Sequence, residues 1–347
     1  MMNAEFSVGS DEPTYVIAEA GSNHNGDLET AMELVDAAAD AGADAVKFQT
    51  FRAESMYVEN SGTVETPKGE RALYDIVADA EMPYEWIPEL HDRCRDRNVD
   101  FLSSPFDERS VDELEPYVPA YKVASSVLSH HPFLETLAER DKPIVASTGA
   151  HDLADVREAV ETMERSGVSD LVLLHCVSSY PTPLESANVR AVRRLAEEFD
   201  VPVGLSDHTL DPTTAPTAAV ALGADVVEKH FTLDSSQEGL DHSYALEPDE
   251  LTAMIDAIQD TETALGTGVV TVQSVEEDWY ESARRTIHAA RDISEGSWIT
   301  SEDISILRSG HRERGLEPKH VDDVVGSVAC TDIEKDQGIS LDDFRES

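Results

Sequence analysis

The sequence predicts an α/β protein: a TIM (β/α)8 barrel followed by a small β-rich domain. Eight short apolar runs alternate with eight amphipathic stretches over about the first three quarters of the 347 residues, which matches this barrel in count and length. The runs are nearly continuous in Val, Ile, Leu and Ala, as expected of parallel strands buried on both faces. A doubly wound open sheet is the alternative, but no GxGxxG turn follows the first run.

Each expected strand ends in a polar turn and is followed by a helical pattern. The first strand, Tyr15–Ala20, leads into Leu28–Ala41, whose apolar residues recur at helical spacing until Gly42. Pro83–Arg97 begins with a proline, which favours the first turn of a helix. The other strands are expected at Ala43–Thr50, Val99–Ser104, Ala120–Ser125, Pro143–Thr148, Leu171–Val177, Val201–Ser206 and Ala224–Phe231, and the other helices at Glu108–Glu115, Pro132–Arg140, Leu153–Ser166, Ala187–Phe199, Thr213–Leu222 and Pro248–Leu265.

The pattern changes after Gly266. We therefore expect the barrel to span residues 1–266, a linker with an acidic centre to span 267–282, and a second domain to span 283–347. The apolar segments of that second domain are short and separated by turns, which indicates β-structure. Within the barrel, the connection Phe51–Met82 is long, and loops of such length usually carry function. We interpret it as a flap over the barrel mouth.

The charge balance excludes several classes of partner. Asp and Glu total 71 against 26 Lys and Arg, which gives a net charge of −45 at pH 7. Nucleic acid and anionic membrane surfaces both require clustered positive charge, so we expect neither as a partner. No run reaches the ~18 apolar residues of a membrane span.

The acidity instead indicates a halophilic protein, and we expect a halophilic archaeon as its source. Only seven of the 26 basic residues are Lys, and the acidic residues are spread along the whole chain. Molar salt shortens the Debye length to ~3 Å and so screens the repulsion that would destabilise a compact state. The chain is 40% hydrophobic in regular short runs, which argues against disorder. An acidic mesophilic enzyme is the alternative.

The cysteines and the opening sequence bear on the compartment. Cys94, Cys176 and Cys330 lie far apart and form no CxxC pair, so we expect neither a disulfide framework nor a zinc-finger site. The start, MMNAEFSVGSDEP, lacks the basic and apolar regions of a signal peptide. These observations predict a cytoplasmic protein.

Polar side chains end every expected strand, which a purely structural barrel would not require. The active sites of TIM barrels lie at these carboxyl ends. Lys47 and Lys122 are each flanked by apolar strand residues, and lysines beside hydroxyl groups suit a phosphate or carboxylate ligand. A solvated loop charge is the alternative for either lysine. The polar residues at these ends include Glu19, Lys47, Gln49, Ser104, Lys122, Ser125, Ser147, Ser178, Ser206, Asp207, His208, Glu228, Lys229 and His230.

Two of these residues indicate a metal, and a third indicates proton transfer. His208 and His230 end the last two strands, which are neighbours in a barrel, and two imidazoles together with oxygen ligands suit Mn²⁺, Fe²⁺ or Zn²⁺. Hydrogen-bonded structural histidines are the alternative. Glu19 ends the first strand, where it could act as a general base or orient water. Its alternative role is to pair with Lys47 or another lysine.

Eight motifs follow one another in order along the barrel. They are IAEAGSNHNGD (17–27), AGADAVKFQTF (41–51), FLSSPFD (101–107), YKVASS (121–126), KPIVASTG (142–149), LLHCVSSYPTPLE (173–185), VGLSDHT (203–209) and EKHFTLD (228–234). Together they closely resemble the sialic acid (N-acetylneuraminate) synthase family, which includes legionaminic, pseudaminic and spore-coat polysaccharide synthases. From about Arg284 the tail, with ILRSG, resembles the antifreeze-like SAF domain, a β-clip fold. The resemblance covers nearly the whole chain.

This resemblance implies a metal-dependent transferase. Phosphoenolpyruvate, an N-acetylmannosamine-type sugar in open-chain form and water would give N-acetylneuraminate and phosphate. The metal, Mn²⁺ or else Mg²⁺ or Co²⁺, would polarise the sugar aldehyde as a Lewis acid. Close alternatives are a legionaminic- or pseudaminic-type synthase, or a spore-coat-type synthase acting on a different N-acyl sugar. More distant ones are an aldolase with a Schiff base at Lys122 and a non-enzymatic sugar-binding protein.

The resemblance also assigns residues motif by motif. His208 and His230 would hold the metal, and Glu19 matches a glutamate of the family's catalytic site. Arg308 would come from the second domain of the other subunit in a domain-swapped homodimer. The sugar would meet Gln49, Tyr180, Asp241 and Arg308, and phosphoenolpyruvate would meet Lys47, Ser104, Lys122, Ser125, Ser147, Ser178 and Ser206.

Three positions depart from the family pattern. Val127 stands where the family commonly has an acidic residue that helps to handle the sugar, which leaves the exact sugar open. Ser178 replaces a common Asn and keeps a hydrogen-bond donor on a shorter side chain. The stretch SGHRERG (309–315) stands where family members often have a shorter PGxG stretch, so this loop is expected to be reshaped.

Overall fold

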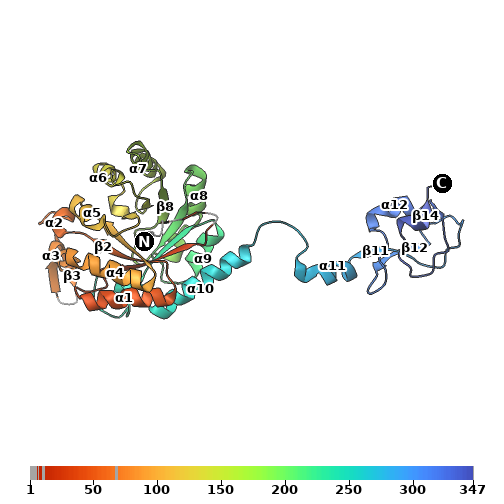
Figure 1. Ribbon diagram of the computed structural model, residues 1–347, viewed down its shortest axis with the longest axis horizontal. Coiled ribbons are helices and arrows are strands. Elements are labelled where there is room, and N and C mark those ends of the chain that lie inside the picture. Colours follow the sequence, from red (N-terminus) through yellow and green to blue (C-terminus); the bar gives the residue numbers. More distant parts are fainter. Residues whose placement is uncertain (1–5, 7, 10–11, 67–68, 347) are drawn as a thin grey trace. The chain divides into compact units, whose positions relative to one another are not determined.

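The computed structural model describes residues 6, 8–9, 12–66 and 69–346 of the chain. They form two compact units, Met1–Gly266 and Thr267–Ser347. Figure 1 shows the first unit as a ring of strands surrounded by helices, and the second as a smaller unit with short strands. The predicted fold class, a TIM barrel followed by a small β-rich domain, is confirmed. No helix in the described part of the chain is both long and apolar enough to cross a membrane.

Eight parallel strands form the barrel. They are β1 (Tyr15–Gly21), β2 (Ala45–Thr50), β5 (Asp100–Pro105), β6 (Tyr121–Val123), β7 (Ile144–Ser147), β8 (Leu171–Cys176), β9 (Val203–Asp207) and β10 (Val226–His230). Their order is β5-β2-β1-β10-β9-β8-β7-β6, and β5 and β6 contact each other to complete the ring. The first strand, β1, pairs with the last, β10, and the contact between β5 and β6, the two ends of the strand order, excludes an open sheet.

Helices cover the outside of this ring. They are α1 (Leu28–Ala41), α4 (Ile87–Arg97), α5 (Glu108–Leu114), α6 (His131–Ala138), α7 (Leu153–Arg165), α8 (Arg190–Glu198), α9 (Thr214–Ala221) and α10 (Pro248–Leu265). The sequence defines their ends locally. Asp27 caps α1 by accepting a hydrogen bond from Thr30 N at 2.8 Å, and Gly42 ends it in the left-handed conformation that glycine favours. The large apolar core lies between the outer faces of the strands and these helices, and includes Leu34 and Ile255.

The barrel interior changes from apolar to polar along each strand. Ile17, Leu102, Val145 and Val226 belong to a small apolar cluster near the amino ends of the strands. Side chains alternate between the two faces of a strand, so residues two and four positions further along face the same interior. Counted from these residues and from Ala45 and Ala120 of the same cluster, those positions hold the buried polar side chains Glu19, Lys47, Ser104, Lys122, Ser147, Glu228 and His230.

The long connection after β2 is itself folded. It contains α2 (Ala53–Met56), a hairpin of β3 (Thr63–Thr66) and β4 (Gly69–Ala72), and α3 (Leu73–Asp79). Its base is fixed where Ala53 N donates to Glu81 Oε1 at 2.7 Å. The interpretation of this segment as a flap stays a prediction.

The second unit is built from two related halves. It contains α11 (Glu277–Ala283), β11 (Arg285–Ala289), β12 (Ile304–Arg308), α12 (Val321–Val324), β13 (Val328–Ala329) and β14 (Phe344–Arg345). Ile293 and Ile333 exchange backbone hydrogen bonds of 2.9 and 2.8 Å. At the same sequence offset, Asp332 accepts from Glu295 N at 2.8 Å and Asp292 accepts from Lys335 N at 2.9 Å. The unit therefore has an approximate internal two-fold axis.

Candidate active site

Lys47 on β2 lies between carboxylates from the two neighbouring strands β1 and β10. Its Nζ is 2.7 Å from Glu19 Oε2, 3.7 Å from Glu228 Oε1 and 3.3 Å from Ser104 Oγ. Burial lowers the pKa of Lys47, but the attraction of Glu19 and Glu228 outweighs burial and the net effect is a raised pKa. Lys47 is therefore a charged ammonium group deep in the barrel mouth.

Glu19 is held by two side chains from β2. Besides the ion pair with Lys47, its Oε1 accepts a hydrogen bond from Gln49 Nε2 at 2.6 Å. Burial raises the pKa of Glu19 to about 7, with Lys47 opposing the rise and Glu228 adding to it. The pairing with Lys47 thus occurs, and a pKa near neutrality also suits a group that exchanges a proton during turnover.

Lys122 on β6 approaches the carboxylate of Glu228 from the opposite side of the barrel. Its Nζ is 3.6 Å from Glu228 Oε1 and donates to Ser147 Oγ at 2.7 Å. Glu228 Oε1 also accepts from Ser206 Oγ at 3.2 Å. Burial lowers the pKa of Lys122, which the attraction of Glu228 offsets only in part. Lys47 is paired with Glu19, so Lys122 has only a share of the Glu228 carboxylate, and an anionic ligand would complete its pairing.

A hydroxyl-lined cradle lies where β6, β7 and β8 end. Gly149 N donates to Ser125 Oγ at 3.0 Å. A Cβ added to Gly149 would lie 2.8 Å from Ser125 Oγ and 2.9 Å from Cys176 Sγ, and would also meet Ser178 Oγ. Glycine therefore keeps this space open. Hydroxyl donors close to Lys122 suit the oxygens of a phosphate or carboxylate.

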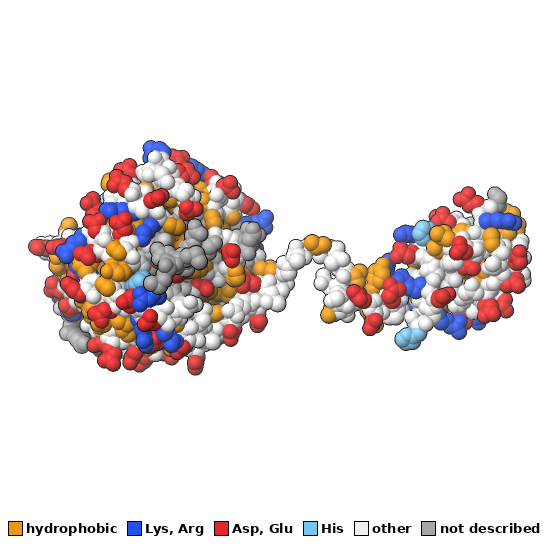
Figure 2. Space-filling model, in the orientation of Figure 1, with side chains coloured by type: hydrophobic (Ala, Val, Ile, Leu, Met, Phe, Trp, Pro, Cys, Tyr) orange, Lys and Arg blue, Asp and Glu red, His pale blue; other side chains and the backbone are white. Residues whose placement is uncertain are grey.

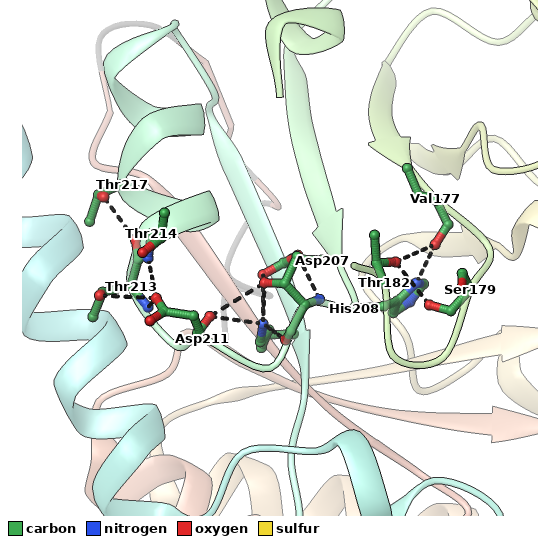
Figure 3. Close-up of polar contacts among 11 residues, drawn as sticks. Val177, Ser179, Thr182, Asp207, His208, Asp211, Thr213, Thr214 and Thr217 are labelled. Carbon is green, nitrogen blue, oxygen red and sulfur yellow. Dashed lines mark hydrogen bonds and ion pairs between the residues drawn. The ribbon is translucent and has the colours of Figure 1, made fainter. Parts of the chain in front are cut away.

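His208 follows β9 and is fixed through its backbone and its ring. Its carbonyl accepts from Thr182 N at 2.8 Å, and its Nδ1 lies 2.9 Å from Val177 O (Figure 3). A carbonyl oxygen can only accept, so Nδ1 carries the proton and Nε2 keeps a free lone pair.

His230 ends β10 and faces His208, with the ring centroids 5.3 Å apart. Among the described residues, the buried Nδ1 of His230 has no hydrogen-bond partner. Two tyrosines enclose the imidazoles: Tyr180 lies 4.2 Å from the His208 ring and Tyr244 lies 5.0 Å from the His230 ring. An unpaired buried nitrogen costs free energy, so a ligand is expected at this point.

The donor set of these two histidines fits a divalent metal. Burial lowers the pKa of His230, which favours the neutral imidazole that binds metals. The described residues contain no cluster of three or more His, Cys, Asp or Glu side chains that could hold a metal ion. A metal held by His208 and His230 would therefore complete its coordination with water and substrate oxygens.

The residues predicted to meet the sugar, apart from Arg308, gather beside the histidines. Asp241 Oδ2 accepts from Ser22 N at 3.1 Å, and Tyr244 OH donates to Asp241 Oδ1. Gly21 has a φ of +52°, and a Cβ there would lie 2.6 Å from Asp241 Oδ2 and 3.5 Å from Gln49 Nε2. Gln49 and Asp241 thus approach each other across Gly21, next to Glu19. Tyr180 lies on the same side of the site, where its ring packs against that of Tyr244.

Arg308 and Val127 have surroundings of a different kind. Arg308 ends β12 in the second unit, where it is exposed and its guanidinium lies 5.6 Å from the Trp279 ring centroid. Its role toward the sugar stays a prediction. Val127 ends a 3-10 turn, Ser125–Val127, and is buried in the apolar core.

Three further residues complete the site. Glu228 was recognisable only as one of many polar residues at strand ends, although its alternation with Val226 and His230 predicts that it points inward. Gly149 ends the motif KPIVASTG but was given no role, and Tyr244 gave no signal, because the closeness of Gly149 to Ser178 and of Tyr244 to the His230 ring is visible only in the fold.

Comparison with known proteins gives a consistent result along the chain. The sequence profile of the NeuB family matches residues 34–270, and that of the SAF domain matches residues 284–345. The spore coat polysaccharide biosynthesis protein SpsE of Bacillus subtilis is 41% identical over 98% of this chain and 96% of its own length. The N,N'-diacetyllegionaminic acid synthase of Legionella pneumophila is 39% identical over 92% of this chain and 91% of its own.

Solved structures agree with these sequence matches. The crystal structure of Bacillus subtilis SpsE covers 100% of this chain and 99% of its own, with 39% identity and a TM-score of 0.67. That of the N-acetylneuraminic acid synthetase of Leptospira borgpetersenii, in complex with citrate, covers 81% of this chain and 95% of its own, with 32% identity and a TM-score of 0.74.

Proposed function

This chain belongs to the NeuB family and carries a C-terminal SAF domain, and on that premise we propose that it condenses phosphoenolpyruvate with an N-acyl amino sugar and water. The products are a nine-carbon 2-keto acid and phosphate. One observation carries the proposal: two buried lysines and a hydroxyl cradle share a barrel mouth with two facing histidines, one of which, His230, has a buried Nδ1 with no hydrogen-bond partner among the described residues.

The residues divide the work between the two substrates. Lys47 and Lys122, with the serines beside them, bind the carboxylate and phosphate of phosphoenolpyruvate. C3 of phosphoenolpyruvate forms a bond to the aldehyde carbon of the open-chain sugar, whose oxygen takes up a proton. Water adds at C2, and the C2–O bond to phosphate breaks to leave the ketone. The pKa of Glu19, about 7, supports a role for this residue in moving the proton of that water.

His208 and His230 would hold a divalent metal, Mn²⁺, with Mg²⁺ or Co²⁺ as alternatives. Such an ion supplies Lewis acidity toward the aldehyde oxygen. Tyr180 and Tyr244 cover the two imidazoles and limit the access of water to them. Asp241 and Gln49 are placed to bind hydroxyl or amide groups of the sugar.

The sugar is either N-acetylmannosamine, giving N-acetylneuraminate, or a relative that leads to a legionaminic-type acid. Val127 replaces the acidic residue expected in the first case and is buried, which favours the second candidate. The 39% identity to a protein named N,N'-diacetyllegionaminic acid synthase supports it too.

Phosphate release tests the proposal. The enzyme, in molar KCl with Mn²⁺, should release phosphate from phosphoenolpyruvate only when a suitable N-acyl hexosamine is present, and a panel of such sugars would identify it. EDTA and His208→Ala should each abolish release, whereas His91→Ala, on the outer helix α4, should not. No release with any N-acyl sugar, or full release by the metal-free enzyme, would contradict the proposal.

An aldolase is the second candidate, because the lowered pKa of Lys122 would also favour a Schiff base. Borohydride trapping with pyruvate separates the two. Covalent labelling of Lys122 would support the aldolase, and its absence together with phosphate release would support the synthase.

A further inference from the structure

A buried ion pair lies directly behind the two histidines, and the proposed reaction makes no use of it. Asp207 on β9 and Lys229 on β10 are cross-strand partners, with Lys229 Nζ 2.6 Å from Asp207 Oδ2. Their side chains are only 3% and 1% exposed. Because strand side chains alternate, this pair points away from the interior that Glu228 and His230 face. Neither residue is therefore placed to touch a substrate in the mouth.

The pair fixes the chain on both sides of His208. Lys229 Nζ donates to Thr209 O and lies 3.4 Å from Asp211 O, and Asp207 Oδ1 accepts from Thr209 N at 3.0 Å. Asp211 in turn caps α9, accepting from Thr214 N at 2.6 Å (Figure 3). One lysine side chain thus ties the loop that carries His208 to the strand that carries His230.

Stability alone does not account for this arrangement. Burying two charges costs desolvation that their attraction often fails to recover, and an apolar pair of similar volume commonly serves the fold equally well. An ion pair differs from an apolar pair because its directional hydrogen bonds hold the backbone in one geometry. Groups that orient metal ligands typically change metal affinity by about 10- to 100-fold when they are lost.

We propose that Asp207 and Lys229 are positioning residues that set the separation of His208 and His230 for a bound divalent metal. The inference rests on the metal site of the proposed function. It predicts that losing the pair impairs metal binding while leaving the anion site around Lys47 and Lys122, on strands β2 and β6, intact.

The test uses the full chain and a variant that leaves no lone buried charge. Lys229→Met alone would strand the Asp207 carboxylate and risks unfolding, so the double variant Asp207→Asn/Lys229→Met is the informative one. Tyr15→Phe is the matched control. It removes a partly buried hydrogen bond of 2.6 Å to Asp100 at the amino ends of the strands, at the other end of the barrel from the histidines.

Mn²⁺ and phosphoenolpyruvate are titrated separately by calorimetry, and the melting temperature of each protein is recorded. We expect the Mn²⁺ Kd of the double variant to rise about 10- to 100-fold while its phosphoenolpyruvate Kd stays within about twofold. In Tyr15→Phe both constants should be unchanged. An unchanged Mn²⁺ Kd in the double variant, equal losses for both ligands, or the same loss in Tyr15→Phe would overturn the inference. Wild-type protein that binds no Mn²⁺ would instead refute the metal site of the proposed function, and the inference with it.

Discussion

Lys47 and Lys122 share the carboxylate of Glu228, yet their pKa values move in opposite directions. Burial lowers the pKa of both, but Lys47 also has Glu19 at 2.7 Å and ends with a raised pKa. Among the described residues Lys122 has no second carboxylate at that distance, and its pKa is lowered. An incoming anion therefore completes the pairing of Lys122, whereas Lys47 is already paired. The two lysines should respond differently to substitution.

Replacing either lysine by methionine should weaken phosphoenolpyruvate binding about 10- to 100-fold, since one hydrogen bond between charged partners is worth roughly 1.5–3 kcal/mol. Lys47→Met should also lower the melting temperature, because it leaves Glu19 buried without its cation. Lys142→Met is the control. Lys142 lies just before β7, at the opposite end of the barrel, where its Nζ donates to Val118 O at 2.6 Å. Calorimetric titration measures the affinities. Unchanged affinity in both Lys47→Met and Lys122→Met would mean that the anion binds elsewhere.

Glu19 should give the enzyme a pH dependence near neutrality. Burial raises its pKa to about 7, so the carboxylate becomes protonated, and unable to accept a proton, as the pH falls through that value. We expect kcat/KM to fall as the pH falls. Glu19→Gln should be slow and should lack this acid limb of the pH profile.

The effect of the Glu19 titration on folding stability has the opposite sign. A raised pKa means that the stabilising contribution of protonated Glu19 is complete below its ordinary pKa of about 4.5 and is lost as the pH rises through about 7. Glu19→Gln should therefore gain stability relative to wild type between pH 5 and pH 8. An acid limb that persists in Glu19→Gln would assign the titration to another group.

At the scale of elements, the barrel could be predicted because each strand is defined by two independent signals. Apolar runs locate the strands, and the polar residue at each carboxyl end locates the mouth. Boundaries are less certain: the run Ala120–Ser125 contains only the three-residue strand Tyr121–Val123, and its last residue begins a 3-10 turn. Most of the predicted anion and metal residues lie together for the same reason, since alternation along parallel strands directs them inward.

Other elements carry no such signal. The hairpin β3–β4, with sequences TVET and GERA, is short and largely polar, so no apolar alternation marks it. The internal symmetry of the second unit depends on backbone pairs such as Ile293 with Ile333, which join residues far apart in the chain. Tyr244 and Gly149 matter through contacts of the same distant kind.

Gly149, just beyond β7, offers a test of the cradle as an element. Its φ is not in the left-handed region, so Gly149→Ala should be tolerated by the backbone while its Cβ displaces Ser125 and Ser178. We expect phosphoenolpyruvate affinity to fall about tenfold, comparable to one lost hydrogen bond to a charged group, with little change in melting temperature. Gly223→Ala is the converse control. It has a φ of +94° and open space around it, so alanine should cost roughly 1–2 kcal/mol of stability and leave affinity unchanged. Normal affinity in Gly149→Ala would mean that the cradle does not bind the anion.

At the scale of the whole molecule, several apolar side chains after the barrel are left in water. Val270 and Val275 are 102% and 91% exposed, and Trp279 is 65% exposed. Large apolar side chains this exposed within one short segment are typical of a segment that a partner covers. This exposure supports the proposal of a homodimer in which Arg308 serves the partner's site.

Subunit complementation tests that proposal. Arg308→Ala should raise the KM for the sugar more than that for phosphoenolpyruvate, because a guanidinium binds carbonyl or hydroxyl oxygens of the sugar. Mixing inactive His208→Ala with Arg308→Ala subunits should restore about a quarter of wild-type activity at a sugar concentration so far below the raised KM that Arg308→Ala alone is nearly inactive. Half of the randomly mixed dimers are heterodimers, and each has one complete site if Arg308 acts across the interface. If exchange of fluorescently labelled subunits is demonstrated and no activity returns, Arg308 does not act in the partner.

The charge of −45 leads to the last prediction, on salt. Acidic side chains are scattered over the drawn face of both units in Figure 2, with few basic ones between them. Repulsion among these carboxylates opposes folding at low ionic strength. Its range falls from a Debye length of about 10 Å at 0.1 M salt to about 3 Å at 1 M. We therefore expect the melting temperature to rise steeply between low salt and molar KCl.

A variant with fewer charges provides the matched control for this salt dependence. Glu33, Glu158, Glu161 and Asp260 are exposed on helices α1, α7 and α10, and their replacement by the corresponding amides lowers the repulsion without touching the core. The variant should melt higher than wild type at low salt and gain less from added KCl. Scanning calorimetry over a KCl series measures both slopes. A flat wild-type profile, or identical slopes in the two proteins, would show that the acidity of this chain is not an adaptation to salt.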